Sequence, residues 1–219
     1  MRVLVTDIRP LIRPRAFAAA LQRADPARRQ KALRYARAED RCLSLGAALL
    51  LSRCLALDGR DPAGVRILPE NGPGKPHCPD IPGFQFNLSH AGRFAACVTA
   101  AVPVGIDVEP FGLGDDYPLE RALTPDETAW LGAEGRGERA RRVARLWTRK
   151  EAFLKAIGRG LAVAPAGVDV TPGKGPLCHG GALWRLHEYP LAGHALSVCA
   201  AGEEPFAEAQ VIPVADLFS

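Results

Sequence analysis

Residues 147–155 read Trp-Thr-Arg-Lys-Glu-Ala-Phe-Leu-Lys, and further upstream residues 105–109 read Gly-Ile-Asp-Val-Glu. The upstream stretch is an apolar run that carries two acids two positions apart, Asp107 and Glu109. If this run is a strand, both carboxylates project from one face, because side chains alternate along a strand. The downstream stretch lies in a segment with the apolar spacing of a helix, formed by Val143, Leu146, Trp147, Phe153, Leu154 and Ile157.

The helical stretch adds a third acid, Glu151, with Lys150 and Lys155 beside it. Hard divalent cations take oxygen ligands, and Mg²⁺ commonly combines one or two carboxylates with waters and the phosphates of a substrate. Two acids from a strand and one from a helix, next to two lysines, therefore suit Mg²⁺ that holds a phosphate-bearing ligand.

The composition is ordinary for a globular protein. The chain has 219 residues, of which 47% are hydrophobic and 24% charged, which argues against disorder. No apolar stretch approaches the roughly 20 residues of a membrane span, and the first residues suit a strand better than a signal peptide. We therefore expect a cytoplasmic protein without a membrane partner, and a monomer.

Neither the cysteines nor the basic residues indicate a particular function by themselves. Six cysteines contain no Cys-x-x-Cys pair, which predicts reduced thiols and neither a zinc site nor a disulfide framework. The net charge is +4, with basic clusters over residues 23–41 and 136–150. These clusters suit solvated helix faces, an acidic protein partner or a phosphate-rich ligand. Nucleic acid is not expected, because aromatics are only 6% of the chain and no binding motif occurs.

The order of expected elements predicts an α+β fold with two similar α/β lobes, residues 1–103 and 104–219. Asp25 followed by Pro26 predicts a helix start, and Thr124 with Glu127 predicts a capping box at another. Other helices are expected over about 38–57 and 139–157, and a turn over 89–92. Strands are expected over 1–8, 65–68, 84–87, 94–100, 104–109, 168–170, 184–189, 196–200 and 209–214.

Four ordered motifs give the chain a family resemblance over about residues 26–200. They are Gly-Lys-Pro at 74–76, Phe-Asn-Leu-Ser-His at 86–90, and the two stretches quoted above. In this order and spacing they resemble the Sfp-type 4′-phosphopantetheinyl transferases. The resemblance implies a pseudo-twofold pair of lobes with coenzyme A between them. It also implies transfer of the 4′-phosphopantetheine arm of coenzyme A to a serine of an apo carrier protein (an acyl, aryl or peptidyl carrier domain), with release of 3′,5′-ADP.

The resemblance implies a role for each acid. Asp107, Glu109 and Glu151 would hold Mg²⁺, or Mn²⁺, against the pyrophosphate. Lys155 lies one helical turn after Glu151, on the same face, and would stabilise or protonate the leaving phosphate. Glu151 is the preferred base for the carrier serine, directly or through a water. Glu127 matches a family position considered for this step, but its capping box gives it another role.

The resemblance also implies contacts with coenzyme A from the first lobe. Ser89 and His90, in the expected turn, would reach the pyrophosphate, and Lys75 would contact the 3′-phosphate. Arg28 and Lys31, three apart on one helix face, would add basic contacts, with the alternative of an ordinary basic surface.

The loop over residues 111–119 is the expected docking site for the carrier protein. Its apolar side chains follow the acidic strand, and the basic residues of 136–149 would suit an acidic carrier. Two other functions stay open on the residues alone. One is a Mg²⁺-dependent phosphohydrolase that cleaves a nucleotide-like substrate, and the other is a basic nucleic-acid-binding module.

Overall fold

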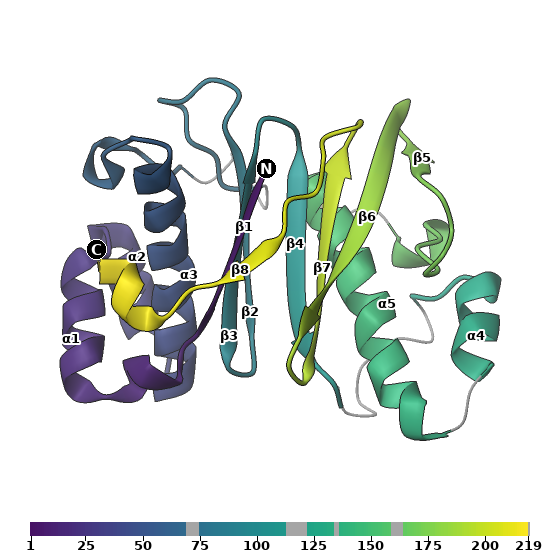
Figure 1. Ribbon diagram of the computed structural model, residues 1–219, viewed down its shortest axis with the longest axis horizontal. Coiled ribbons are helices and arrows are strands. Elements are labelled where there is room, and N and C mark those ends of the chain that lie inside the picture. The colour runs from purple at the N-terminus through teal and green to yellow at the C-terminus, as the bar shows by residue number, and fades with distance from the viewer. Residues whose placement is uncertain (69–74, 113–121, 134–135, 159–163, 219) are drawn as a thin grey trace.

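Two four-stranded sheets lie side by side, with helices on their outer sides (Figure 1). The structure, a computed structural model, describes residues 1–68, 75–112, 122–133, 136–158 and 164–218. The helices are α1 (Pro14–Arg23), α2 (Pro26–Leu33), α3 (Ala38–Leu57), α4 (Pro125–Gly132) and α5 (Arg136–Ala156). The strands are β1 (Arg2–Asp7), β2 (Gln85–Ala91), β3 (Phe94–Ala100), β4 (Val104–Pro110), β5 (Leu177–His179), β6 (Ala182–Leu191), β7 (His194–Ala201) and β8 (Ala209–Val211).

Both lobes repeat one topology. In each, a strand is followed by helices and then by a pair of strands, and the first strand pairs antiparallel with the last. The order is β2-β3-β1 in the first sheet and β4-β7-β6 in the second, each with one further strand, β8 or β5. The predicted α+β class with two similar lobes is therefore confirmed.

Three apolar cores hold the layers together. The first lies between the first sheet and its helices and is formed by α3 residues such as Leu45 and Leu49 with Leu4 and Cys97 of the strands. The third lies between α5 and the second sheet, around Phe153 and Trp184. The second core is shared by the two lobes. Side chains alternate along each strand, so each sheet has one face towards its helices and one face away from them, and the two faces that point away from the helices meet in this core. Its members include Val3, Val5, Val98, Ile106, Val108 and Val198.

The helix starts follow the predicted chemistry. The Asp25 carboxylate accepts a hydrogen bond from the Arg28 N–H at 3.0 Å, and Pro26 opens α2. Thr124 and Glu127 form a reciprocal capping box at the start of α4. These caps satisfy N–H groups that have no partner within the helix. No helix within the described ranges is both long and apolar enough to cross a membrane.

Three expected local structures are wrong. Residues 65–68 and 168–170 form no strand; Leu68 makes only an isolated bridge to His77. The turn expected over residues 89–92 is part of β2, because the ladder with β3 continues to Ala91. The chain reverses one step later, at Gly92, whose φ of +56° suits glycine.

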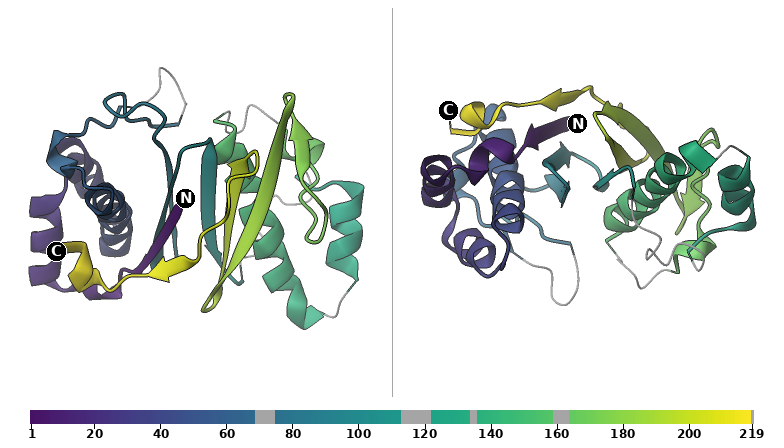
Figure 2. Two further views of the ribbon diagram at one scale, coloured as in Figure 1. Left: turned by 45° about the horizontal axis from the view of Figure 1, so that its top comes forward. Right: turned by 90° about the horizontal axis from the view of Figure 1, so that it is seen from below.

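The end of the chain returns to the first lobe, where β8 pairs parallel with β1 (Figures 1 and 2). Beyond it, the 3₁₀ helix Val214–Phe218 places Val214 and Leu217 in the core beneath α3. The predicted boundary between residues 103 and 104 falls between β3 and β4, and it stays a prediction about domains. The second lobe's sheet is built from β4 to β7, and residues 209–218 pack with the first.

Candidate active site

Strand β4 carries the predicted acids past helix α5. A Cβ on Gly105 would lie 2.1 Å from the Ala152 carbonyl oxygen, so the backbones of β4 and α5 are in direct contact there. Alternation then puts Gly105, Asp107 and Glu109 on the face of β4 towards α5. The strand-and-helix arrangement predicted from the sequence is therefore present.

Asp107 is the centre of a buried polar cluster that draws on both lobes. It is 3% exposed, and its Oδ1 accepts from the Ser89 hydroxyl of β2 at 2.8 Å. The same oxygen accepts from Lys155 Nζ of α5 at 2.5 Å, and Lys155 also donates to Ser89 Oγ at 3.2 Å. The other oxygen, Oδ2, is buried without a hydrogen-bond partner.

Glu151 lies beside this cluster, one turn before Lys155. Burial raises the pKa of the Glu151 carboxyl, the charge of Lys155 lowers it, and the charge of Asp107 raises it again. The negative charge of Asp107 therefore reaches Glu151 and disfavours its ionisation.

The fit to a divalent cation rests on these two acids. A buried carboxylate oxygen without a donor is costly, and Asp107 Oδ2 is the kind of oxygen that a cation binds. Within the residues that the structure describes, however, no group of three or more histidine, cysteine, aspartate or glutamate side chains is arranged to hold a metal ion. The convergence of Glu109 with Asp107 and Glu151 therefore stays a prediction.

A small basic pocket of about 150 Å³ lies between α2, α3 and β2. Arg28, Lys31 and His90 line it, so three of the predicted coenzyme A contacts come together. The ring of His90 loses water there, and this loss, followed by the charges of Lys155 and Lys31, lowers the pKa of its imidazole. The two cationic side chains of this pocket, Arg28 and Lys31, suit phosphate groups.

The side chain of Lys75 contacts the first residue of β4 and does not line this pocket. Its Nζ donates to the Val104 carbonyl oxygen at 2.7 Å, while the neighbouring Pro76 lines the pocket. Its predicted contact with the 3′-phosphate stays a prediction.

Glu127 and Lys150 form a buried ion pair that does not involve the Asp107 cluster. Lys150 Nζ lies 2.7 Å from Glu127 Oε2 and also donates to the carbonyl oxygens of Pro165 and Val168. Glu127 accepts from the N–H groups of Thr124 and Val170. Lys150 was expected beside the metal and phosphate, and this was wrong. The capping role of Glu127, the alternative to a base, is confirmed.

Asn87 is a site residue to which the sequence analysis assigned no role. It is buried, and its Oδ1 accepts from the N–H of Ile106 at 2.9 Å, which ties β2 to β4 where no strand ladder joins them. Asn87 and Ser89 lie two apart on one strand and both reach β4. Their spacing of two residues, which places both side chains on one face of the strand, was the signal that could have identified it.

The predicted docking loop is only partly within the described residues. Residues 113–121 lie outside them, whereas Phe111 is described, with the Arg141 guanidinium 5.0 Å from its ring centre. A pocket of about 630 Å³ adjoins Phe111 and includes Arg141, Arg145 and Glu188.

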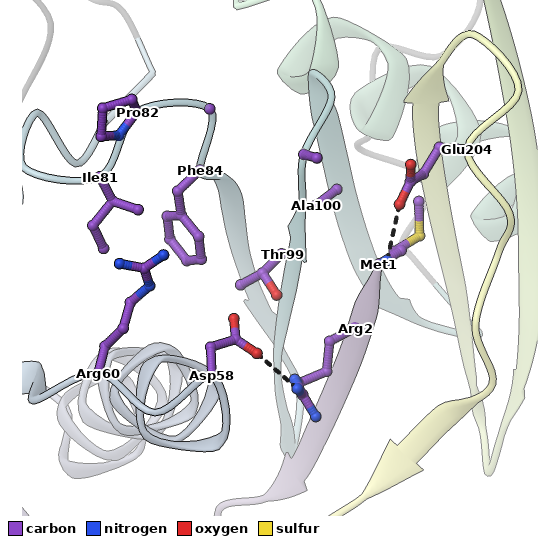
Figure 3. Close-up of a pocket in the computed structure, with 12 residues that line it drawn as sticks. Met1, Arg2, Asp58, Arg60, Ile81, Pro82, Phe84, Thr99, Ala100 and Glu204 are labelled. Atoms are coloured by element: carbon purple, nitrogen blue, oxygen red, sulfur yellow. Dashed lines mark hydrogen bonds and ion pairs between the residues drawn. The ribbon is translucent and has the colours of Figure 1, made fainter.

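Another pocket, of about 380 Å³, contains none of the predicted site residues (Figure 3). Its charged groups are largely paired with each other: Arg2 Nη2 lies 2.7 Å from Asp58, and the Met1 amine lies 2.9 Å from Glu204. The chemistry is therefore concentrated at the Asp107 cluster.

Comparisons with known proteins agree with the resemblance. Residues 103–199 match the family model of the 4′-phosphopantetheinyl transferase superfamily. A 4′-phosphopantetheinyl transferase of Bacillus subtilis is 33% identical over 62% of this chain and 61% of its own length. The 4′-phosphopantetheinyl transferase Sfp of Bacillus subtilis strain 168 is 32% identical, over 63% and 62%. The resemblance to the Sfp-type family is thereby confirmed.

The extent of these matches matters for the site. The chain spans about three fifths of the length of these relatives, and the family match includes Asp107, Glu109, Glu151 and Lys155 but no residue of the first lobe's pocket. The crystal structure of Thermotoga maritima holo-[acyl-carrier-protein] synthase aligns with a TM-score of 0.36 at 22% identity, over 47% of this chain and 64% of that one. That similarity is too small to support an argument.

Proposed function

We propose that this chain is a 4′-phosphopantetheinyl transferase, or holo-[acyl-carrier-protein] synthase, that uses coenzyme A and Mg²⁺. It moves the phosphopantetheine arm of coenzyme A to a serine of an apo carrier protein and releases 3′,5′-ADP. The supporting observation is the Asp107 cluster, in which Ser89 of one lobe and Lys155 of the other meet a buried carboxylate beside Glu151. The match of residues 103–199 to this superfamily supports this reaction for the cluster.

Asp107 and Glu151 would hold the cation, with Glu109 as the third ligand from the same strand face. Bound there, Mg²⁺ would neutralise charge on the pyrophosphate and on the departing nucleotide. Mn²⁺ could replace it, since both ions take oxygen ligands.

The chain's own residues divide the rest of the chemistry. Glu151, directly or through a water, would accept the proton of the carrier serine hydroxyl. The serine oxygen forms a bond to the phosphorus that carries pantetheine. The bond from this phosphorus to the nucleotide phosphate breaks, and its electron pair stays on that phosphate. The ammonium group of Lys155 would neutralise the charge on the leaving oxygen.

The basic pocket would hold the phosphates of coenzyme A. Arg28 provides a planar fork for bidentate contact, and Lys31 and His90 add donors from neighbouring elements. Lys75 would reach the 3′-phosphate, and Ser89 would reach the pyrophosphate.

The partner would be an acidic carrier domain that docks at residues 111–119. The support is the basic face of α5, where Arg141 lies against Phe111 and Arg145 is close to the same pocket. The monomeric state, the cytoplasmic location and the absence of nucleic-acid partners stay predictions.

Mass spectrometry of apo carrier proteins tests the proposal. Incubation with coenzyme A and Mg²⁺ should add one phosphopantetheinyl group to the carrier serine and release one equivalent of 3′,5′-ADP. Asp107→Asn should abolish both. Release of 3′,5′-ADP that is independent of the carrier would instead support a phosphohydrolase, and no reaction with any carrier would contradict the proposal.

A further inference from the structure

Lys155 is paired with the same Asp107 carboxylate to which the divalent cation would bind. Its Nζ lies 2.5 Å from Asp107 Oδ1, in a cluster where the Asp107 side chain is 4% exposed. The second partner of Lys155 is Ser89 Oγ, at 3.2 Å. The ammonium group is therefore the counter-ion of a buried carboxylate that the proposed function assigns to the metal.

The two ends of this ion pair differ in freedom. Asp107 is fixed by the Ser89 hydroxyl, and its backbone is held at the preceding residue, where the Ile106 N–H donates to Asn87. Lys155 has a flexible four-carbon side chain, and 28% of its surface is exposed. If a second cation arrives, Lys155 is the group that moves.

A divalent cation and the Lys155 ammonium group repel each other at such short range, and burial increases the repulsion. Both also seek the same carboxylate. Lys155 on Oδ1 therefore opposes binding of the cation at Oδ2 unless its ammonium group moves away, and the anionic pyrophosphate of coenzyme A would offer that group a new partner.

We propose that Lys155 is an internal competitor of the divalent cation at Asp107, and that bound coenzyme A relieves this competition by attracting the lysine side chain. This inference rests on the proposed function. Coenzyme A and the metal then bind with positive coupling, and the cation binds weakly until the nucleotide is present. By linkage, the metal strengthens coenzyme A binding by the same factor.

Titration of the purified chain with Mn²⁺, in the absence of coenzyme A and carrier, tests the competition. The free Mn²⁺ signal in electron paramagnetic resonance gives the dissociation constant directly. Lys155→Met removes the charge and keeps the length, so it should bind Mn²⁺ about tenfold tighter or better, the ratio that corresponds to about 1.4 kcal/mol. Lys174→Met is the matched control, because Lys174 pairs with Asp126 and Asp169 instead, and it should bind like the wild type.

Thermal unfolding verifies that the variant is folded and gives a second readout. Without Lys155, the Asp107 carboxylate lacks its counter-ion, so Lys155→Met should melt lower in EDTA and gain more from Mn²⁺ than the wild type does. Equal or weaker Mn²⁺ binding by Lys155→Met would overturn the inference, and so would an equal gain in melting temperature.

Coupling is measured by repeating the titration with saturating coenzyme A. The wild type should bind Mn²⁺ more tightly with coenzyme A than without it, and this gain should shrink in Lys155→Met. A gain of the same size in both proteins would contradict relief of competition by the nucleotide.

The Mn²⁺ titrations use no carrier protein. Lys155→Met can therefore bind Mn²⁺ more tightly even if no carrier is modified, and carriers can be modified even if Mn²⁺ binding is unchanged. The two proposals therefore fail separately.

Discussion

The ion pair between Glu127 and Lys150 is sealed from solvent, with 0% and 2% of the two side chains exposed. Among the described residues, the hydrogen-bond partners of the pair are the start of α4 on one side and the backbone of Pro165, Val168 and Val170 on the other. A buried pair of this kind matters mainly through what happens when one partner is lost.

Glu127→Ala should lower the free energy of unfolding by about 3–5 kcal/mol, because it leaves the Lys150 ammonium group buried without its partner. Urea denaturation measures this loss. The turnover of the folded variant should be retained, since Glu127 does not contact the Asp107 cluster. Asp126→Ala is the matched control, because its pair with Lys174 is exposed and such pairs contribute little. Lost transfer with unchanged stability would make Glu127 the base instead.

The residue pattern predicted part of this site. The spacing of Asp107 and Glu109 and the helical step from Glu151 to Lys155 indicated which side chains share a face. At 3.6 residues per turn, Lys150 points about 100° away from Glu151 around the helix. Lys150 was expected at the metal because it is next to Glu151 in the sequence, and this rotation was not taken into account. The hydrogen bonds of Ser89 and Asn87 to β4 depend on how the lobes meet, which no local pattern contains.

At the scale of elements, β4 and α5 approach so closely that only glycine fits between them. A Cβ at residue 105 would lie 2.1 Å from the Ala152 carbonyl oxygen and 2.5 Å from the Ala156 nitrogen. Both atoms are backbone and cannot rotate away. The same contact sets the spacing between Asp107 on the strand and Glu151 and Lys155 on the helix.

Gly105→Ala should therefore push α5 away from β4 and cost about 1–3 kcal/mol or more of unfolding free energy by overpacking. Carrier modification should fall further than stability alone explains, because the acids and Lys155 separate. Gly132→Ala is the control, since nothing lies within 4 Å of a Cβ there. Activity equal to that of the wild type in a folded Gly105→Ala protein would show that this spacing is not required.

The elements that the sequence predicted well have local causes. The caps at Asp25 and Thr124 and the long apolar helices were readable because capping and periodicity act within one turn. The β2 turn was placed too early because Ser89 and His90 are polar, whereas their strand conformation comes from pairing with β3. Residues 168–170 look like a strand, but their backbone binds Lys150, Glu127 and Arg149 instead of a sheet.

At the scale of the whole molecule, the two lobes repeat a topology without a clear sequence repeat. In each lobe, apolar side chains must alternate along the strands so that they fill the cores on both faces of the sheet. Many different apolar sequences satisfy that requirement. The lobes share a core, and the chain crosses between them twice, before β4 and again before β8. This arrangement predicts that they unfold together.

Leu217→Ala tests that cooperativity. Leu217 is 5% exposed in the first lobe's core, so its truncation should cost about 2–5 kcal/mol. All three tryptophans, Trp130, Trp147 and Trp184, belong to the second lobe, and their fluorescence reports on that lobe alone. If the lobes unfold as one unit, Leu217→Ala should shift the tryptophan transition in urea by the same amount as the circular dichroism transition.

The surface variant Leu183→Ala is the control and should shift neither transition appreciably, since Leu183 is 37% exposed. A tryptophan transition that stays at the wild-type midpoint while the helical signal moves would mean that the lobes unfold independently, despite the core between them.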